Sequence, residues 1–183
     1  MPEAEKRGLK NLKNTVESIP ELTKEYSVEL FEKHNVFTRG ELEARELIYL
    51  EQYSQQINIE AKITSEMAMR SIVPAVTDYI STITSSIINL KTVLPKANTT
   101  GQEKLITELS DNLAGLLTSI DILDKVIPIA QDLEIDLHKQ AVYYSEEVLN
   151  AMADVRKYAD ALESKTDREM WPFPSYEELL FKL

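Results

Sequence analysis

Apolar residues recur every three or four positions from residue 38 to residue 94, which is the spacing of one face of an α-helix. Thr38 followed by Glu41 is typical of a capping box, and Pro95 ends the pattern. The pattern predicts one very long helix over residues 39–94, about 84 Å long if continuous. Because an interior proline bends a helix, we predict a kink at residues 70–74, next to Pro74, rather than a break.

Two further stretches repeat this apolar spacing. Residues 98–101 form a clear turn signal, and apolar steps of four and three after it predict a second helix over residues 102–131. Pro128 is expected to loosen the last turn of that helix. A third helix is predicted over residues 136–165. The three segments, with short links between them, indicate an all-α antiparallel helical bundle over residues 38–166.

The N-terminal half of the long helix, residues 39–60, is predicted to extend beyond the other two helices. Residues 1–37 form a lead-in with one short helix over residues 27–34. The lead-in, the C-terminal tail, a missing domain or another subunit has to cover the apolar side chains of that half. These side chains are Leu42, Leu47, Ile48, Leu50, Tyr53 and Ile57.

Asn58 and Glu60 interrupt an otherwise apolar stretch in this half. Two interpretations are open. In the first interpretation, one of these two side chains faces water and its neighbour makes a hydrogen bond between helices. In the other, they make a polar contact with a missing partner domain.

Residues 167–183 form a tail that concentrates large apolar side chains at the end of the chain. Soluble proteins avoid exposing such a patch, so we predict that the tail docks on another surface. The two prolines hold the segment extended, which makes it cheap to order. The candidate docking residues are Trp171, Pro172, Phe173, Pro174, Tyr176, Leu180 and Phe181, together with Tyr53, Ile57, Asn58 and Glu60 in the long helix.

Composition narrows the possible functions. The net charge of −11 disfavours nucleic acid as a partner, and the absence of cysteine fits a cytoplasmic protein. The longest uncharged run, residues 79–90, is too short and too polar to cross a membrane. The only histidines, His34 and His138, have no metal-site spacing, and no Glu-x-x-His motif occurs. We therefore expect no catalytic, cofactor-binding or metal-binding residue in this chain.

Four stretches, in order, resemble one enzyme family across the whole chain. They are residues 3–12, Leu50-Glu51-Gln52-Tyr53, Ile57-Asn58-Ile59-Glu60-Ala61 with Pro74-Ala75 after it, and the tail sequence Trp-Pro-Phe-Pro-Ser-Tyr with Leu-Leu-Phe. Together they are similar to the C-terminal region of the type III glutamine synthetases. None of the family's catalytic motifs is present, namely the metal-binding glutamates and histidine and the arginines that bind ATP and glutamate.

The resemblance implies a non-catalytic C-terminal domain that helps to assemble or scaffold the oligomer. It implies a parent enzyme that ligates ammonia to glutamate using ATP and Mg or Mn. The implied partners are the catalytic domain of the same polypeptide and neighbouring subunits in a large ring-stacked homo-oligomer.

A second hypothesis, from the residues alone, is a free-standing helical-bundle interaction or adaptor protein. The same apolar stripes suit it, and it is expected to self-associate through residues 39–60. A bundle enzyme is disfavoured because no cluster of catalytic groups is present.

Overall fold

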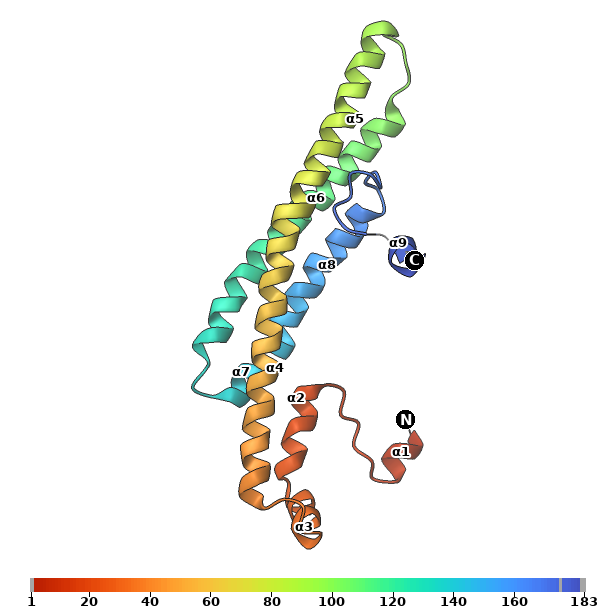
Figure 1. Cartoon of the computed structure of the whole chain (residues 1–183). Coiled ribbons are helices and arrows are strands. Elements are labelled where there is room, and N and C mark those ends of the chain that lie inside the picture. The colour runs from red at the N-terminus through yellow and green to blue at the C-terminus, as the bar shows by residue number, and fades with distance from the viewer. Residues whose placement is uncertain (1, 175, 182–183) are drawn as a thin grey trace. The chain divides into compact units, whose positions relative to one another are not determined.

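The computed structural model describes residues 2–174 and 176–181, without the side chains of residues 2, 5, 176 and 177. The described residues contain helices and no strand, which confirms the all-α prediction (Figure 1). In chain order the helices are α1 Pro2–Lys6, α2 Thr15–Ser18, the 3-10 helix η1 Ile19–Thr23, α3 Glu25–Lys33, α4 Arg39–Met67, the π-helix η2 Ala68–Ile72, α5 Val73–Val93, α6 Thr100–Asp132, α7 Leu137–Tyr143, the π-helix η3 Tyr144–Val148, α8 Leu149–Glu163 and α9 Tyr176–Phe181.

The predicted long helix is present as α4, η2 and α5, which follow one another without a break over 55 residues. It begins at the predicted capping box. The backbone N–H of Thr38 donates to Glu41 Oε2 at 2.8 Å, and the Thr38 hydroxyl lies 2.9 Å from the same oxygen. These bonds satisfy donors that a helix start otherwise leaves unpaired.

The kink predicted at residues 70–74 stays a prediction, but the π-helix η2 lies there and ends at Ile72, two residues before Pro74. The backbone N–H of Val73 donates to the carbonyl of Ala68, five residues earlier. Pro74 has no N–H to donate, and the wider turn before it lets the helix continue through the proline.

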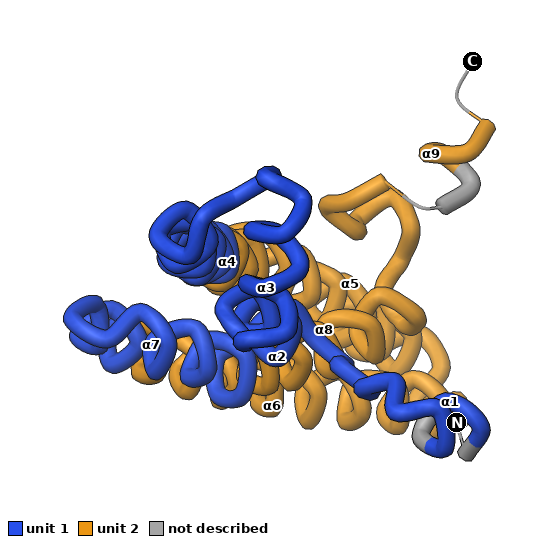
Figure 2. Tube along the Cα trace, turned by 90° about the horizontal axis from the view of Figure 1, so that it is seen from below, with its two compact units in different colours: residues 1–59, 128–148 blue, residues 60–127, 149–183 orange. Residues whose placement is uncertain are grey.

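The described chain divides into two compact units, coloured separately in Figure 2. Unit 1 comprises residues 1–59 and 128–148, and unit 2 comprises residues 60–127 and 149–183.

The core of unit 1 joins the lead-in to the long helix. Val16 of α2 and Ile19 of η1 are buried with Leu50 of α4 and Ala141 of α7. The lead-in and α7 therefore cover Leu50, one of the apolar side chains of residues 39–60 that were predicted to need a cover. Leu47, on the same helix, stays about half exposed.

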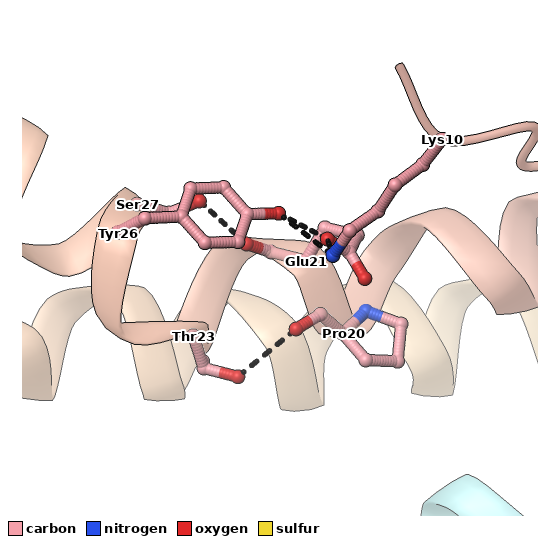
Figure 3. Close-up of polar contacts among 6 residues, drawn as sticks. All are labelled: Lys10, Pro20, Glu21, Thr23, Tyr26 and Ser27. Atoms are coloured by element: carbon pink, nitrogen blue, oxygen red, sulfur yellow. Dashed lines mark hydrogen bonds and ion pairs between the residues drawn. The ribbon is translucent and has the colours of Figure 1, made fainter. Parts of the chain in front are cut away.

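A polar network fixes the lead-in within unit 1 (Figure 3). The ammonium of Lys10 and the hydroxyl of Tyr26 both bond to the carboxylate of Glu21, and the ammonium also lies 4.9 Å from the centre of the Tyr26 ring. The Ser27 hydroxyl donates to the Glu21 carbonyl at 2.7 Å. Opposite charges and a cation–π contact thus connect the segment before α2 to the start of α3.

Unit 2 contains helices paired in antiparallel fashion. Ser65 Oγ in α4 donates to Asp124 Oδ1 in α6 at 2.6 Å, and Lys91 Nζ at the end of α5 lies 2.7 Å from Glu103 Oε1 at the start of α6. Numbers rise along one helix as they fall along the other, so the two run in opposite directions (Figure 1).

The third predicted helix, residues 136–165, is divided into three elements. α7 ends at Tyr143, η3 follows with wider turns, and α8 ends at Glu163. Neither glycine nor proline marks this change in the sequence. Pro128 lies inside α6, which continues past it to Asp132.

A close approach between α6 and α8 makes Gly115 sensitive to substitution. A Cβ added at Gly115 would overlap the ring of Tyr158. We expect Gly115→Ala to lower the free energy of unfolding by about 1 kcal/mol, because overpacking outweighs the gain in helix propensity. Chemical denaturation of the purified chain measures this. Gly101→Ala in the same helix is the control, since nothing lies within 4 Å of its added Cβ, and it should not destabilise. Equal stability of both variants would contradict the overlap.

The ion pair between α6 and the segment after α8 predicts an acid-sensitive contribution to stability. Lys165 Nζ donates to Glu108 Oε2 at 2.7 Å, and this bond holds the pKa of the Glu108 carboxyl below its usual range. A lowered folded-state pKa stabilises the fold above the unfolded-state pKa, and this contribution is lost as pH falls through the folded-state value. We therefore expect Lys165→Gln to flatten the fall in Tm between about pH 5 and pH 3.

Calorimetry over that pH range measures the effect. Lys104→Gln is the control, because Lys104 Nζ lies 3.7 Å from the other oxygen of Glu108 and is mostly exposed. It should change the slope much less. Identical pH profiles for Lys165→Gln and the unmodified chain would show that the ion pair is not formed in solution.

Candidate functional site

The predicted docking tail begins with a turn organised by Asp167. The Asp167 carbonyl accepts from the backbone N–H groups of Met170 and Trp171, both at 3.0 Å, and its carboxylate accepts from the N–H of Glu169 at 2.8 Å. This turn reverses the chain after α8 and sets the position of Trp171.

The two aromatic side chains of the tail contact each other. The Trp171 and Phe173 rings lie 6.2 Å apart, edge to face, and both are partly buried. Pro172 and Pro174 are exposed. An edge-to-face pair of this kind contributes about 1 kcal/mol beyond its buried area. The segment therefore has a preferred conformation before any partner binds.

The short helix α9 at the end of the tail exposes its apolar side chains. Leu179, Leu180 and Phe181 are 65%, 73% and 77% exposed. Arg168 Nη2 lies 3.9 Å from Glu178 Oε1, which links α9 to the Asp167 turn. The side chain of Tyr176, another predicted docking residue, lies outside the described part of the structure.

The predicted docking residues of the long helix have mixed environments. Ile57 is buried, and Tyr53 packs beside the unit 1 core. Asn58 Oδ1 accepts a hydrogen bond from Gln131 Nε2 at 3.2 Å, and Glu60 is exposed. The first interpretation of Asn58 and Glu60 was one hydrogen bond between helices and one side chain that faces water, and this arrangement agrees with it. A contact of the pair with a missing partner stays a prediction.

Sequence reasoning missed a polar cavity of about 700 Å³ in unit 1. At its wall, Ser54 and Tyr144 are buried, 3% and 2% exposed. Burial also raises the pKa of the Tyr144 hydroxyl, so it stays protonated well into the alkaline range. The lining residues are Glu51, Ser54, Gln55, Asn58, Gln131, Glu134, Ile135, Leu137, Gln140 and Tyr144. The sequence offered one signal for this cavity, because Ser54 places a hydroxyl at an inward position one turn after Leu50.

The described residues contain no group of three or more His, Cys, Asp or Glu side chains that could hold a metal ion. In the same part of the chain, no helix combines the length and the apolar character that crossing a bilayer requires.

This geometry defines a class of protein: an all-α domain with an apolar tail left uncovered at its C-terminal end. Comparison with known proteins identifies the family. A family model described as "Glutamine synthetase C-terminal domain" matches residues 1–91. A glutamine synthetase of Butyrivibrio fibrisolvens is 30% identical over 99% of this chain and 26% of its own length. A type-3 glutamine synthetase of Dictyostelium discoideum is 28% identical over 97% of this chain and 25% of its own length.

A glutamine synthetase of Bacteroides fragilis is 26% identical over 98% of this chain and 25% of its own length. The chain thus spans about a quarter of the length of the curated relatives that it matches. It corresponds to the C-terminal domain of glutamine synthetase-type proteins, as the four sequence stretches predict.

Trp171 provides a direct probe of the tail, because it is the only tryptophan in the chain. We expect Phe173→Ala to move Trp171 emission to longer wavelength and to increase its quenching by acrylamide, since the indole loses its aromatic neighbour and gains water. Steady-state fluorescence of the purified chain measures both quantities. Phe181→Ala is the control, because that ring is already exposed, and it should leave the emission unchanged. An unchanged Phe173→Ala spectrum would mean that the two rings do not pair in solution.

Proposed function

We propose that this domain is a non-catalytic assembly element of a glutamine synthetase, and that its tail docks on the rest of the enzyme. The proposed parent enzyme ligates ammonia to glutamate with ATP and Mg or Mn, in the cytoplasm, as a homo-oligomer. The catalytic ligands of that reaction belong, in this proposal, to the part of the relatives that the chain does not span.

The observation that carries the proposal is the separation between the core and the tail. Among the described residues, the buried apolar side chains extend from Val16 to Leu162, and none lies beyond Leu162. The tail therefore adds nothing fully buried to the fold. Yet it contains Trp171, Phe173 and the exposed leucines and phenylalanine of α9. Apolar side chains that a fold does not need are explained by a second surface that covers them.

The remainder of the glutamine synthetase polypeptide is the occupant that the observations favour. The relatives are about four times as long as the matched region, so in this proposal most of the polypeptide lies outside this chain. The net charge of −11 and the small apolar cluster of α9 suit a protein surface with a hydrophobic patch better than a nucleic acid.

The test is the double substitution Leu180→Asp and Phe181→Asp in the full-length polypeptide that contains this domain. Burial of each apolar side chain contributes about 2 kcal/mol, so each substitution is expected to weaken the docking contact about 30-fold or more. Mass photometry over a range of concentrations measures the oligomer, and calorimetry measures its Tm. Dissociation of the oligomer places the contact between subunits, whereas a lower Tm with intact assembly places it within one subunit.

Val93→Asp is the matched control, because Val93 has the same 77% exposure as Phe181 but ends α5. It should leave assembly and Tm unchanged. Unchanged assembly together with unchanged Tm in the Leu180→Asp, Phe181→Asp protein would refute the docking role.

A further inference from the structure

A short basic stretch of the lead-in, residues 6–13, stands out in a strongly acidic chain. The chain has 20 Lys and Arg against 31 Asp and Glu, yet this stretch contains no acidic residue. Every residue in it is exposed, and Leu9 and Leu12 are 63% and 41% exposed. We call residues 6–13 the basic segment, and it extends from the end of α1 toward α2 (Figure 1). Its basic residues are Lys6, Arg7, Lys10 and Lys13.

The chain itself uses only part of the basic segment. Lys10 is bonded to Glu21, and Arg7 Nε lies 3.0 Å from Glu3 Oε1. Lys6 and Lys13 form no ion pair with any described side chain. The Lys10 contact holds the segment on its own lead-in, so these two lysines and both leucines are presented to a partner.

Unit 1 also has an acidic groove with apolar walls, which we call the α4–α7 groove. Its volume is about 710 Å³, and Leu47 and Ile135 in its lining are 53% and 96% exposed. Glu43 and Glu46 line it as well, and neither forms an ion pair within the described part of the chain. The remaining lining residues are Leu50, Asp136, Leu137, His138 and Lys139, of which Asp136 and Lys139 pair with each other at 2.9 Å.

The basic segment and the α4–α7 groove are complementary in charge and in apolar character. One offers two lysines and two leucines, and the other offers two carboxylates beside exposed Leu47 and Ile135. None of the residues that line the groove comes from residues 1–37, so the segment does not cover the groove of its own chain. Opposite charges that meet across an interface fix the partner and the register of binding.

We propose that the basic segment of one copy of this chain binds the α4–α7 groove of a second copy. Because each copy has both surfaces, two copies pair reciprocally through two equal contacts, related by a two-fold axis. This assigns a partner to the exposed part of residues 39–60, where self-association was one of the sequence-based expectations. The proposal does not rest on the docking role of the tail, since no tail residue takes part.

Electrostatics and size set the expected strength of this contact. The net charge of −11 makes two copies repel each other in general, but salt at 0.15 M screens charges more than about 8 Å apart. Charge pairs in direct contact are screened less, so the local match decides. Two eight-residue segments form a small interface, and we expect a dissociation constant of about 10–100 μM for the isolated chain.

Sedimentation equilibrium of the purified chain from about 1 μM to 1 mM tests the proposal. We expect a monomer–dimer equilibrium whose dissociation constant rises as salt is added, because the paired charges are exposed. The Leu180→Asp, Phe181→Asp variant should dimerise like the unmodified chain, which separates this contact from the tail. A chain that stays monomeric throughout, or a dimer that is lost in the tail variant, would overturn the proposal.

Charge reversal on each surface assigns the contact. Lys6→Glu with Lys13→Glu should weaken dimerisation about ten-fold or more, and so should Glu43→Lys with Glu46→Lys. An equimolar mixture of these two variants should dimerise again, because the reversed segment of the first meets the reversed groove of the second. A mixture that stays monomeric would overturn the proposal, and this comparison does not depend on the activity of any enzyme.

The matched control is Lys62→Glu with Lys125→Glu, which changes the net charge as much as the reversal of Lys6 and Lys13. Both control lysines are exposed and lie in unit 2, outside the segment and the groove. This variant should dimerise like the unmodified chain. Equal weakening by the two lysine pairs would show general repulsion between acidic chains and would overturn the proposal.

Discussion

Pro74 cannot donate a backbone hydrogen bond, and its ring crowds the preceding turn, yet the helix continues through it. The π-helix η2 makes this possible by adding one residue to the turn before the proline. Ala68, Ile72 and Val76, on both sides of the proline, are all buried. A break at this point would separate α5 from the helix before it. The antiparallel pairing of unit 2 therefore depends on how the backbone accommodates one missing N–H.

Three buried serines show how helix packing treats an inward hydroxyl. Ser119 donates to the Gly115 carbonyl of its own helix at 2.8 Å, and Ser65 donates to Asp124 on a facing helix at 2.6 Å. Both hydroxyls are thereby satisfied. Ser54 is the exception, because its hydroxyl has no partner among the described residues. An unpaired buried hydroxyl costs about 1–3 kcal/mol, a large share of the stability of a single domain. Nearby packing therefore does not account for Ser54.

Long-range periodicity made the main helices predictable, and short-range detail did not follow from it. The capping box at Thr38 and the proline at residue 95 gave the ends of the long helix to within one residue, because each acts through local backbone chemistry. The elements α2 and η1 were missed, since four or five residues are too few to show a period. The π-helix η3 was missed because no proline in the sequence indicates it. The cavity was missed because Ser54 and Tyr144 are brought together by packing, at a sequence separation that no motif spans.

The tail combines features that lower the entropic cost of binding. Pro172 and Pro174 restrict the backbone in the free chain, and the Trp171–Phe173 pair and the Asp167 turn hold the segment in one conformation. A segment ordered in advance loses less freedom when it docks, so more of the energy of apolar burial remains as affinity. A tail selected only for solubility would need none of these restraints and would replace the leucines and phenylalanine of α9 with polar residues. Preorganisation together with exposed apolar area is the physical combination expected of a docking element.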